Sequence, residues 1–417
     1  MSSRKKKRNT SGEVWIIVII AILCLLACGL AVYLYWQTTD KKSDGRPVAT
    51  EMSTGTDSTS VTATVTEITT EEITEAPDPE MEINKKISDR IAEMDIREKI
   101  GQMFFIRGNP DYDQTMFDTY NPGGVLLFGS DVQDKTYTEL QDYIDNFQRM
   151  SGTPLLIGID EEGGTVSRLS GNYNIVDQPF LSPRELYADG GMDEVIQDSH
   201  RKSTLLLDLG INVNFAPVVD YSTDIWDFMY ERAFGDTIDE TCEFAKEIVS
   251  AMNEDGMGSV LKHFPGYGSN GDTHTDIITD DRDYDTFASQ DFLPFQSGID
   301  AGAECVLVCH NIVTCMDSKW PASLSENVHN VLREKLGFIG VIITDDLAMD
   351  GVADFCGADT AAVQAILAGN DMMIVSDFYT QYDAVLQAVQ DGTISEQRLD
   401  ESVARILKWK YHLNILR

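Results

Sequence analysis

The sequence predicts an α/β protein in which a (β/α)8 barrel, or TIM barrel, is preceded by one transmembrane helix and a disordered stalk. Three observations support this fold class. Eight short apolar segments recur after residue 100 and alternate with segments of helical periodicity. Polar side chains gather at the carboxyl ends of those segments, where barrels of this kind carry their functional residues. A single long apolar run stands near the N-terminus.

The first residues have the pattern of a membrane anchor. Residues 4–8 are all basic, and residues 14–36 form an almost unbroken apolar run with aromatic side chains near its ends. About 20 such residues span a bilayer as a helix, and a basic flank stays in the cytoplasm. We therefore expect a cytoplasmic tail at 1–12, a transmembrane helix at 13–36 and a place at the cell membrane, with the rest of the chain extracellular. Cys28 ends a segment that resembles a lipoprotein cleavage site, which leaves lipidation as an alternative.

The next segment, residues 37–82, is rich in Thr, Ser, Glu and Asp and has few large apolar side chains. It cannot bury enough apolar surface to offset the entropy lost on ordering, so we expect a disordered stalk. The folded domain is then expected at 83–417. The whole chain has a formal net charge of −37, which argues against nucleic acid as a partner.

The seven cysteines do not indicate a metal centre. No two of them have the Cys-x-x-Cys spacing, and five are scattered through the expected domain. Buried thiols are the simplest interpretation, with a disulfide or a metal site as alternatives. We predict neither a metal nor a cofactor.

The eight apolar segments define the expected strands. Each is long enough for a buried parallel strand, and they cover residues 103–106, 124–128, 155–160, 213–219, 258–263, 305–310, 341–345 and 372–375. Helical periodicity is clear at 137–149, 241–254 and 361–368. Strands that alternate with helices form a parallel sheet, and eight of them favour a closed barrel over an open doubly wound sheet.

Two further helices frame the barrel. Asp95 and Glu98 have the spacing of a capping box, so a helix is expected to begin near Asp95 and to lead into the first strand. Residues 398–416 have amphipathic spacing, and this last helix would close the ring after the eighth strand.

One group of candidate functional residues follows the fifth expected strand. Lys262 and His263 end that strand, and Asp272 and His274 lie in the loop that follows. A carboxylate two residues from an imidazole can orient it and raise its basicity. The pattern therefore indicates a general acid/base pair that could protonate a leaving oxygen.

Adjacent carboxylates follow two other strands. Asp345 ends the seventh strand and is a candidate nucleophile, whereas Asp346 is better interpreted as a helix cap. Asp160 ends the third strand and could bind hydroxyl groups, while Glu161 and Glu162 are better interpreted as a solvated acidic turn.

These stretches together resemble the family 3 glycoside hydrolases, and specifically their single-domain bacterial β-N-acetylhexosaminidases. The likeness extends from residue 97 to the last helix. The motifs that carry it are residues 97–103, 159–164, 214–220, 232–236, 262–268 and 344–349.

The resemblance implies an enzyme that hydrolyses terminal N-acetyl-β-glucosaminyl residues with retention of configuration. It implies that Asp345 is the nucleophile and that His274, supported by Asp272, is the acid/base. It also implies that residues around the sugar bind its hydroxyls, namely Asp160, Arg232, Lys262, His263 and His310. The expected partner is an oligosaccharide or a cell-wall glycan.

The sequence departs from the family pattern in the loop after Lys262. Tyr267 replaces a common histidine, and Thr273 stands where serine is more usual in the Asp-x-His motif. Alternatives to the hexosaminidase are a β-glucosidase or β-xylosidase of the same family, an N-acetylglucosaminide phosphorylase, and a cell-wall-binding protein without catalytic activity.

Overall fold

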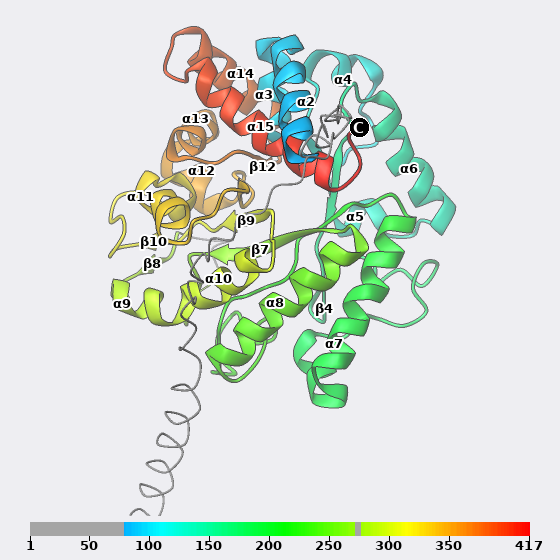
Figure 1. Ribbon diagram of the computed structural model, residues 1–417, viewed down its shortest axis with the longest axis vertical. Coiled ribbons are helices and arrows are strands. Elements are labelled where there is room, and N and C mark those ends of the chain that lie inside the picture. The colour runs from blue at the N-terminus through cyan, green and yellow to red at the C-terminus, as the bar shows by residue number, and fades with distance from the viewer. Residues whose placement is uncertain (1–78, 272–276) are drawn as a thin grey trace, which may run out of the picture. The chain divides into compact units, whose positions relative to one another are not determined.

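Eight parallel strands form a nearly closed barrel in the computed structural model, which describes residues 79–271 and 277–417. The strand order around the barrel is β11, β9, β7, β6, β3, β2, β1 and β12, and every neighbouring pair is parallel. A single bridge between Ile343 and Met372 joins the two ends of this order. Figure 1 shows the helices around the outside of the strands.

All eight expected strands are present. They are β1 (Phe104–Arg107), β2 (Gly124–Leu127), β3 (Leu156–Ile159), β6 (Val213–Asn214), β7 (Gly258–Phe264), β9 (Cys305–Val308), β11 (Val341–Thr344) and β12 (Met373–Val375). Strand β6 is much shorter than the expected 213–219, because the backbone N–H of Ala216 turns back to the carbonyl oxygen of Asn214 and Pro217 has no N–H to donate. Beyond this point an isolated bridge joins Val218 to Lys262.

Two small sheets lie outside the barrel order. Strands β4 (Glu161–Gly163) and β5 (Val166–Ser167) form an antiparallel hairpin directly after β3. Strands β8 (Thr279–Asp280) and β10 (Ile312–Val313) pair in parallel.

The expected helices are confirmed as α6 (Tyr137–Met150), α8 (Ile238–Asp255), α13 (Ala358–Ala368) and α15 (Glu396–His412). Asp95 caps α3 (Ile96–Gln102), and Asp95 and Glu98 make both hydrogen bonds of a capping box. The remaining helices are α2 (Pro79–Glu93), α4 (Gln114–Tyr120), α5 (Gly129–Val132), α7 (Pro183–Asp208), α9 (Tyr284–Thr286), α10 (Phe292–Asp300), α11 (Glu326–Asn330), α12 (Asp350–Cys356) and α14 (Phe378–Gln390). Short 3-10 and π segments cover Ala322–Leu324, Phe287–Asp291 and Val331–Lys335.

Two aromatic rings fill the inside of the barrel. Phe105 and Phe215 meet edge to face with their centroids 5.4 Å apart. A Cβ at Gly158 would lie 2.5 Å from Phe215 and 2.9 Å from Phe105, so only glycine leaves these rings enough room. The packed rings make the barrel a solid support for the pocket above them.

The fold prediction needs correction at its N-terminal end. None of the helices within the described residues has the length and apolar character needed to cross a membrane. The expected tail, transmembrane helix and most of the stalk, at 1–78, lie outside the described residues. Membrane anchoring is therefore not supported, and the expected extracellular location stays a prediction.

Helical structure is already present before the predicted boundary at residue 83. Helix α2 starts at Pro79, because proline suits the first turn of a helix and Glu80 and Glu82 suit its positive end. Its buried Ile87 packs in one cluster with Val403 and Leu407 of α15. This apolar contact ties α2 to the last helix (Figure 1).

Candidate active site

An open pocket of about 730 Å³ lies at the carboxyl ends of the barrel strands. Its floor includes Phe215 inside the barrel, and its walls carry six carboxylates, namely Asp160, Glu162, Asp227, Glu231, Asp345 and Asp346. Cationic or imidazole side chains in the same walls are Arg168, Arg232, Lys262 and His263. Four of the sequence-predicted binding residues, Asp160, Arg232, Lys262 and His263, therefore meet in one pocket.

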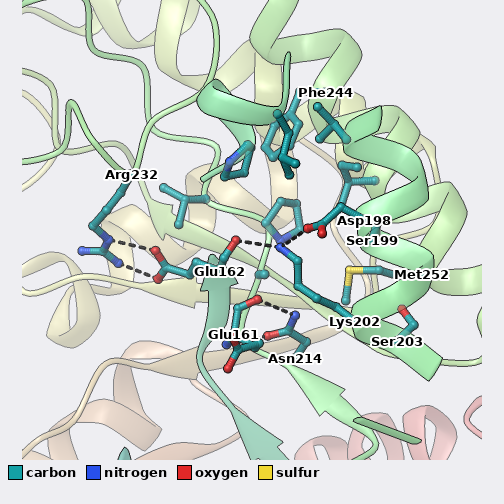
Figure 2. Close-up of a pocket in the computed structure, with 17 residues that line it drawn as sticks. Glu161, Glu162, Asp198, Ser199, Lys202, Ser203, Asn214, Arg232, Phe244 and Met252 are labelled. Atoms are coloured by element: carbon teal, nitrogen blue, oxygen red, sulfur yellow. Dashed lines mark hydrogen bonds and ion pairs between the residues drawn. The ribbon is translucent and has the colours of Figure 1, made fainter. Parts of the chain in front are cut away.

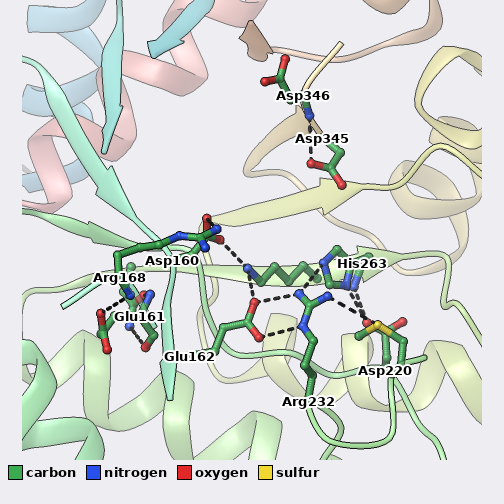
Figure 3. Close-up of polar contacts among 12 residues, drawn as sticks. Asp160, Glu161, Glu162, Arg168, Asp220, Arg232, His263, Asp345 and Asp346 are labelled. Atoms are coloured by element: carbon green, nitrogen blue, oxygen red, sulfur yellow. Dashed lines mark hydrogen bonds and ion pairs between the residues drawn. The ribbon is translucent and has the colours of Figure 1, made fainter. Parts of the chain in front are cut away.

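A buried network of charges that includes Asp160, Glu162 and Arg232 lies on one wall (Figure 3), and Lys262 is at its centre. Its Nζ lies 2.7 Å from Asp160 Oδ1 and 2.7 Å from Glu162 Oε1. Arg232 binds Glu162 through two hydrogen bonds, from Nη2 at 2.8 Å and from Nε at 3.0 Å. Arg168 donates to the other oxygen of Asp160 at 3.0 Å. The network holds every one of these side chains in a fixed place.

The charged groups of this wall shift one another's pKa values. Burial works to raise the pKa of Glu162, but the opposing charges of Lys262 and Arg232 outweigh it and lower the pKa to about 2. Burial also works to raise the pKa of Asp160, and Lys262 and Arg168 bring it well below its usual range. Burial works to lower the pKa of Lys262, and the two carboxylates raise it above its usual value. All of these groups are therefore charged near neutral pH.

His263 stands beside the network in one defined tautomer. Its Nε2 lies 3.2 Å from Nη2 of Arg232, which can only donate, so Nε2 accepts. Its Nδ1 lies 2.7 Å from Oδ2 of the buried Asp220 and must donate to it. Asp220 also accepts from the backbone N–H groups of His263 and Tyr267. The His263 ring is thus held in a fixed orientation by Asp220.

Tyr267, which stands where the resemblance leads one to expect a histidine, is buried and packs edge to face on His263, with ring centroids 5.2 Å apart. It also meets Phe228 of the pocket wall, with ring centroids 6.0 Å apart. The substitution therefore supplies an aromatic support for the imidazole of His263.

Asp345 and Asp346 line the pocket from the end of β11 and point in different directions. Figure 3 shows the Asp345 carboxylate directed toward the charged wall and the Asp346 carboxylate directed away from it. Asp345 Oδ1 accepts the backbone N–H of Asp346 at 2.9 Å. Asp346 accepts from Ser376 and from the backbone of Ala348, so it shapes the turn after the strand.

His310 is buried against the main chain of Asp346 and is not among the side chains that line the pocket. Its Nε2 lies 3.1 Å from the carbonyl oxygen of Asp346, and its Nδ1 lies 2.7 Å from Ser323 Oγ. The ring therefore supports the Asp345–Asp346 turn, and the sugar-binding role expected for His310 stays a prediction.

Asp272 and His274, the expected acid/base pair, lie outside the described residues. The chain on both sides of them is anchored by Arg282, which binds Asp280, Asp291 and the carbonyl oxygen of Gly266. Asn270 also donates to Asp280 at 2.6 Å. The role of His274 and Asp272 remains a prediction.

Sequence reasoning missed Glu162 as a site residue. Successive side chains of a strand point to opposite faces, and in β4 this separates the two glutamates. Glu161 turns into the hairpin and accepts from Ser167 and from the backbone of Leu169. Glu162 turns to the pocket and holds Arg232 and Lys262. The alternation of side chains along a strand was the pattern in the sequence that could have distinguished Glu162 from Glu161.

The opposite surroundings of the two glutamates predict opposite pH effects on stability. The pKa of Glu162 is lowered from 4.5 to about 2, so its carboxylate stabilises the fold above about pH 4.5 and this contribution is lost as the pH falls toward 2. We expect Glu162→Gln to lower the Tm near neutral pH, by an amount that shrinks across this window. Thermal unfolding of the wild type and of Glu162→Gln, from neutral pH down to about pH 2, measures this difference in Tm.

Glu161→Gln is the matched control. Burial raises the pKa of Glu161, against hydrogen bonds from Ser167 and the backbone, so its ionisation costs stability as the pH rises. The trend of the difference in Tm with pH should therefore have the opposite sign. Parallel trends for the two variants would contradict the assigned environments.

The comparison with protein families and the comparison with individual relatives agree. Residues 95–409 match the family described as glycosyl hydrolase family 3 N terminal domain. The chain is 30% identical over 276 residues to a β-hexosaminidase of Tolumonas auensis, a match that covers 66% of this chain and 81% of the relative. It is 32% identical over 288 residues to a β-hexosaminidase of Xanthomonas campestris, covering 68% of this chain and 85% of the relative.

A solved structure has a similar fold. It is a family 3 β-N-acetylglucosaminidase from a Paenibacillus species, with a TM-score of 0.73 and 30% sequence identity. The match covers 77% of this chain and 63% of that chain.

Proposed function

Because the chain belongs to glycosyl hydrolase family 3, we propose that it is a retaining β-N-acetylhexosaminidase that removes terminal N-acetyl-β-glucosaminyl residues. One observation carries the proposal. The Asp345 carboxylate is directed into a pocket whose facing wall is the fixed network of Asp160, Lys262, Glu162 and Arg232 (Figure 3). The substrate would be an oligosaccharide or a cell-wall glycan.

The charged wall is suited to bind the hydroxyl groups of one sugar ring. Asp160 can accept from a hydroxyl, while Lys262 and Arg232 can donate to its neighbours. Hydrogen bonds to charged groups are worth about 1.5–3 kcal/mol each, roughly twice those between neutral groups. Since the wall is already ordered by its internal bonds, little entropy is lost when a sugar replaces water.

In the proposed mechanism Asp345 attacks the anomeric carbon while His274, oriented by Asp272, protonates the leaving oxygen. The product of this step is a covalent glycosyl-enzyme. Water then attacks the same carbon while His274 takes its proton, which breaks the bond to Asp345, frees its carboxylate and restores the β configuration. The hydrogen bond from the Asp346 N–H steadies the Asp345 carboxylate when it leaves.

The test is hydrolysis of nitrophenyl β-glycosides by the purified protein. We expect clear preference for the N-acetylglucosaminide over the glucoside and the xyloside, with the β anomer as the first product in NMR spectra. Preference for the glucoside or xyloside would assign the chain to another activity of the family. Absence of turnover on all three would favour a sugar-binding protein.

Replacement of His274 should affect substrates unequally. Without the acid, His274→Ala should lose about 10²- to 10⁴-fold in kcat/KM on glycosides with alkyl leaving groups. Nitrophenol leaves without protonation, so its release should suffer much less. The two substrate classes are compared under the same conditions, and equal losses would contradict the assignment of His274.

Water rather than phosphate is favoured as the acceptor. The three cationic side chains that line the pocket within the described residues are Arg168, Arg232 and Lys262, and each already pairs with a carboxylate. The remaining carboxylates of the pocket would repel a phosphate dianion. Product analysis with added phosphate should give the free sugar, and accumulation of a sugar 1-phosphate would contradict this choice.

A further inference from the structure

Behind the charged wall, a second buried cation contacts the same hairpin from the opposite side (Figure 2). Lys202 of α7 is 8% exposed, and its Nζ donates to the backbone carbonyl oxygen of Glu162 at 2.9 Å. The same Nζ pairs with Asp198, one turn earlier on α7, at 2.9 Å. Neither Lys202 nor Asp198 lines the sugar pocket.

The hairpin is pressed closely against this lysine. Gly163 follows Glu162 with φ of +92°, a conformation that favours glycine. A Cβ at Gly163 would lie 2.2 Å from the carbonyl oxygen of Leu181 and 3.2 Å from Lys202 Nζ. Helix α7 and the residues before it therefore leave room for the main chain of Gly163 at one position only.

The neighbouring peptide is held in a comparable way by the end of strand β6. The Asn214 side chain accepts from the N–H of Glu161 and donates to its carbonyl oxygen, both at 3.0 Å. Asn214 thus fixes Glu161, and Lys202 fixes Glu162. The carboxylate of Glu162 in turn joins Arg232 to Lys262 on the pocket side.

We propose that Lys202 is a positioning residue for the sugar-binding wall: from α7 it fixes the main chain of Glu162 and so the carboxylate that aligns Arg232 with Lys262. This inference rests on the proposed function, because it assigns Lys202 an effect on sugar binding. Lys202 touches no substrate. Its ammonium group acts through the carbonyl group and the side chain of Glu162.

The space around Lys202 allows a clean test. A small cavity of about 30 Å³ lies behind the hairpin, and apolar side chains form much of its lining, among them Leu186, Val195, Phe244, Ile248 and Met252. Replacing both partners of a buried ion pair by apolar residues of similar size is often neutral for stability, whereas removing one is costly. The double variant Asp198→Leu/Lys202→Met should therefore fold, even if Lys202→Met alone does not.

We expect the double variant to keep a Tm close to that of the wild type and to lose about 10- to 100-fold in kcat/KM on the nitrophenyl N-acetylglucosaminide. The loss should lie mainly in KM, and it should be the same for alkyl and nitrophenyl leaving groups, because Lys202 acts on the sugar and not on the leaving oxygen. Arg201→Met is the matched control, since Arg201 is exposed on the same helix and pairs with Asp198. It should stay within about twofold of wild type.

The outcomes separate the two proposals. If the wild type does not hydrolyse N-acetylglucosaminides, the proposed function fails. If the wild type is active and the folded double variant stays within about twofold of it, Lys202 is not a positioning residue. A loss confined to one class of leaving group would also overturn the inference.

Discussion

Asp345→Ala should reduce kcat on a nitrophenyl N-acetyl-β-glucosaminide by at least about 10³-fold and leave the fold intact. The large loss follows from the removal of the atom that forms the covalent bond. The fold should survive because no cation in the described part of the chain pairs with Asp345, so its removal leaves no buried charge without a partner. Steady-state kinetics and the Tm of the same preparation measure both effects.

Asp346→Asn is the control for this experiment. Asp346 neighbours Asp345, but its carboxylate is directed away from the charged wall and accepts from Ser376 and the backbone of Ala348. An amide can still accept one of these bonds, so its loss of kcat should be far smaller than that of Asp345→Ala. If Asp346→Asn were the more damaging change, the two aspartates would have to exchange roles.

Lys262→Met should have the second largest effect, on binding and on stability together. It leaves the buried carboxylates of Asp160 and Glu162 without their shared ammonium, and breaking a buried ion pair in this way costs about 3–5 kcal/mol of stability. On the order of 10²-fold in kcat/KM should be lost as well, since a donor to the sugar is removed. Kinetics and chemical denaturation give the two quantities.

The double variant Lys262→Met/Asp160→Asn separates the two effects. It keeps the pairing of Glu162 with Arg232 and leaves only Arg168, which is partly exposed, without its carboxylate, so it should recover much of the lost stability. It should not recover kcat/KM, because the donor is still missing. Recovery of activity with stability would mean that Lys262 only supports the fold.

The sequence was sufficient for the arrangement of the barrel because each strand is a short, continuous apolar segment and its polar ends follow directly. Asp160, Lys262, His263 and Asp345 were placed at one rim on that basis alone, and the structure brings them to one pocket. The sequence could not predict which side chains pair when they are far apart along the chain. Arg232 meets Glu162 across a separation of 70 residues, which no local pattern indicates.

The errors have equally local causes. The hydropathy of residues 13–36 predicted a transmembrane helix; these residues lie outside the described part of the chain, and no helix within that part is able to span a membrane. Glu161 and Glu162 looked alike in sequence, but the two faces of β4 give one to the hairpin and the other to the pocket.

The most direct test of the account is to trap the sugar on the enzyme. A 5-fluoro N-acetylglucosaminyl fluoride forms a glycosyl-enzyme faster than water can release it, and mass spectrometry of proteolytic peptides then locates the bond. The account predicts one fluorinated N-acetylhexosamine unit attached to Asp345. A sugar attached to any other residue, or turnover of the reagent with no attached sugar at any time, would contradict it.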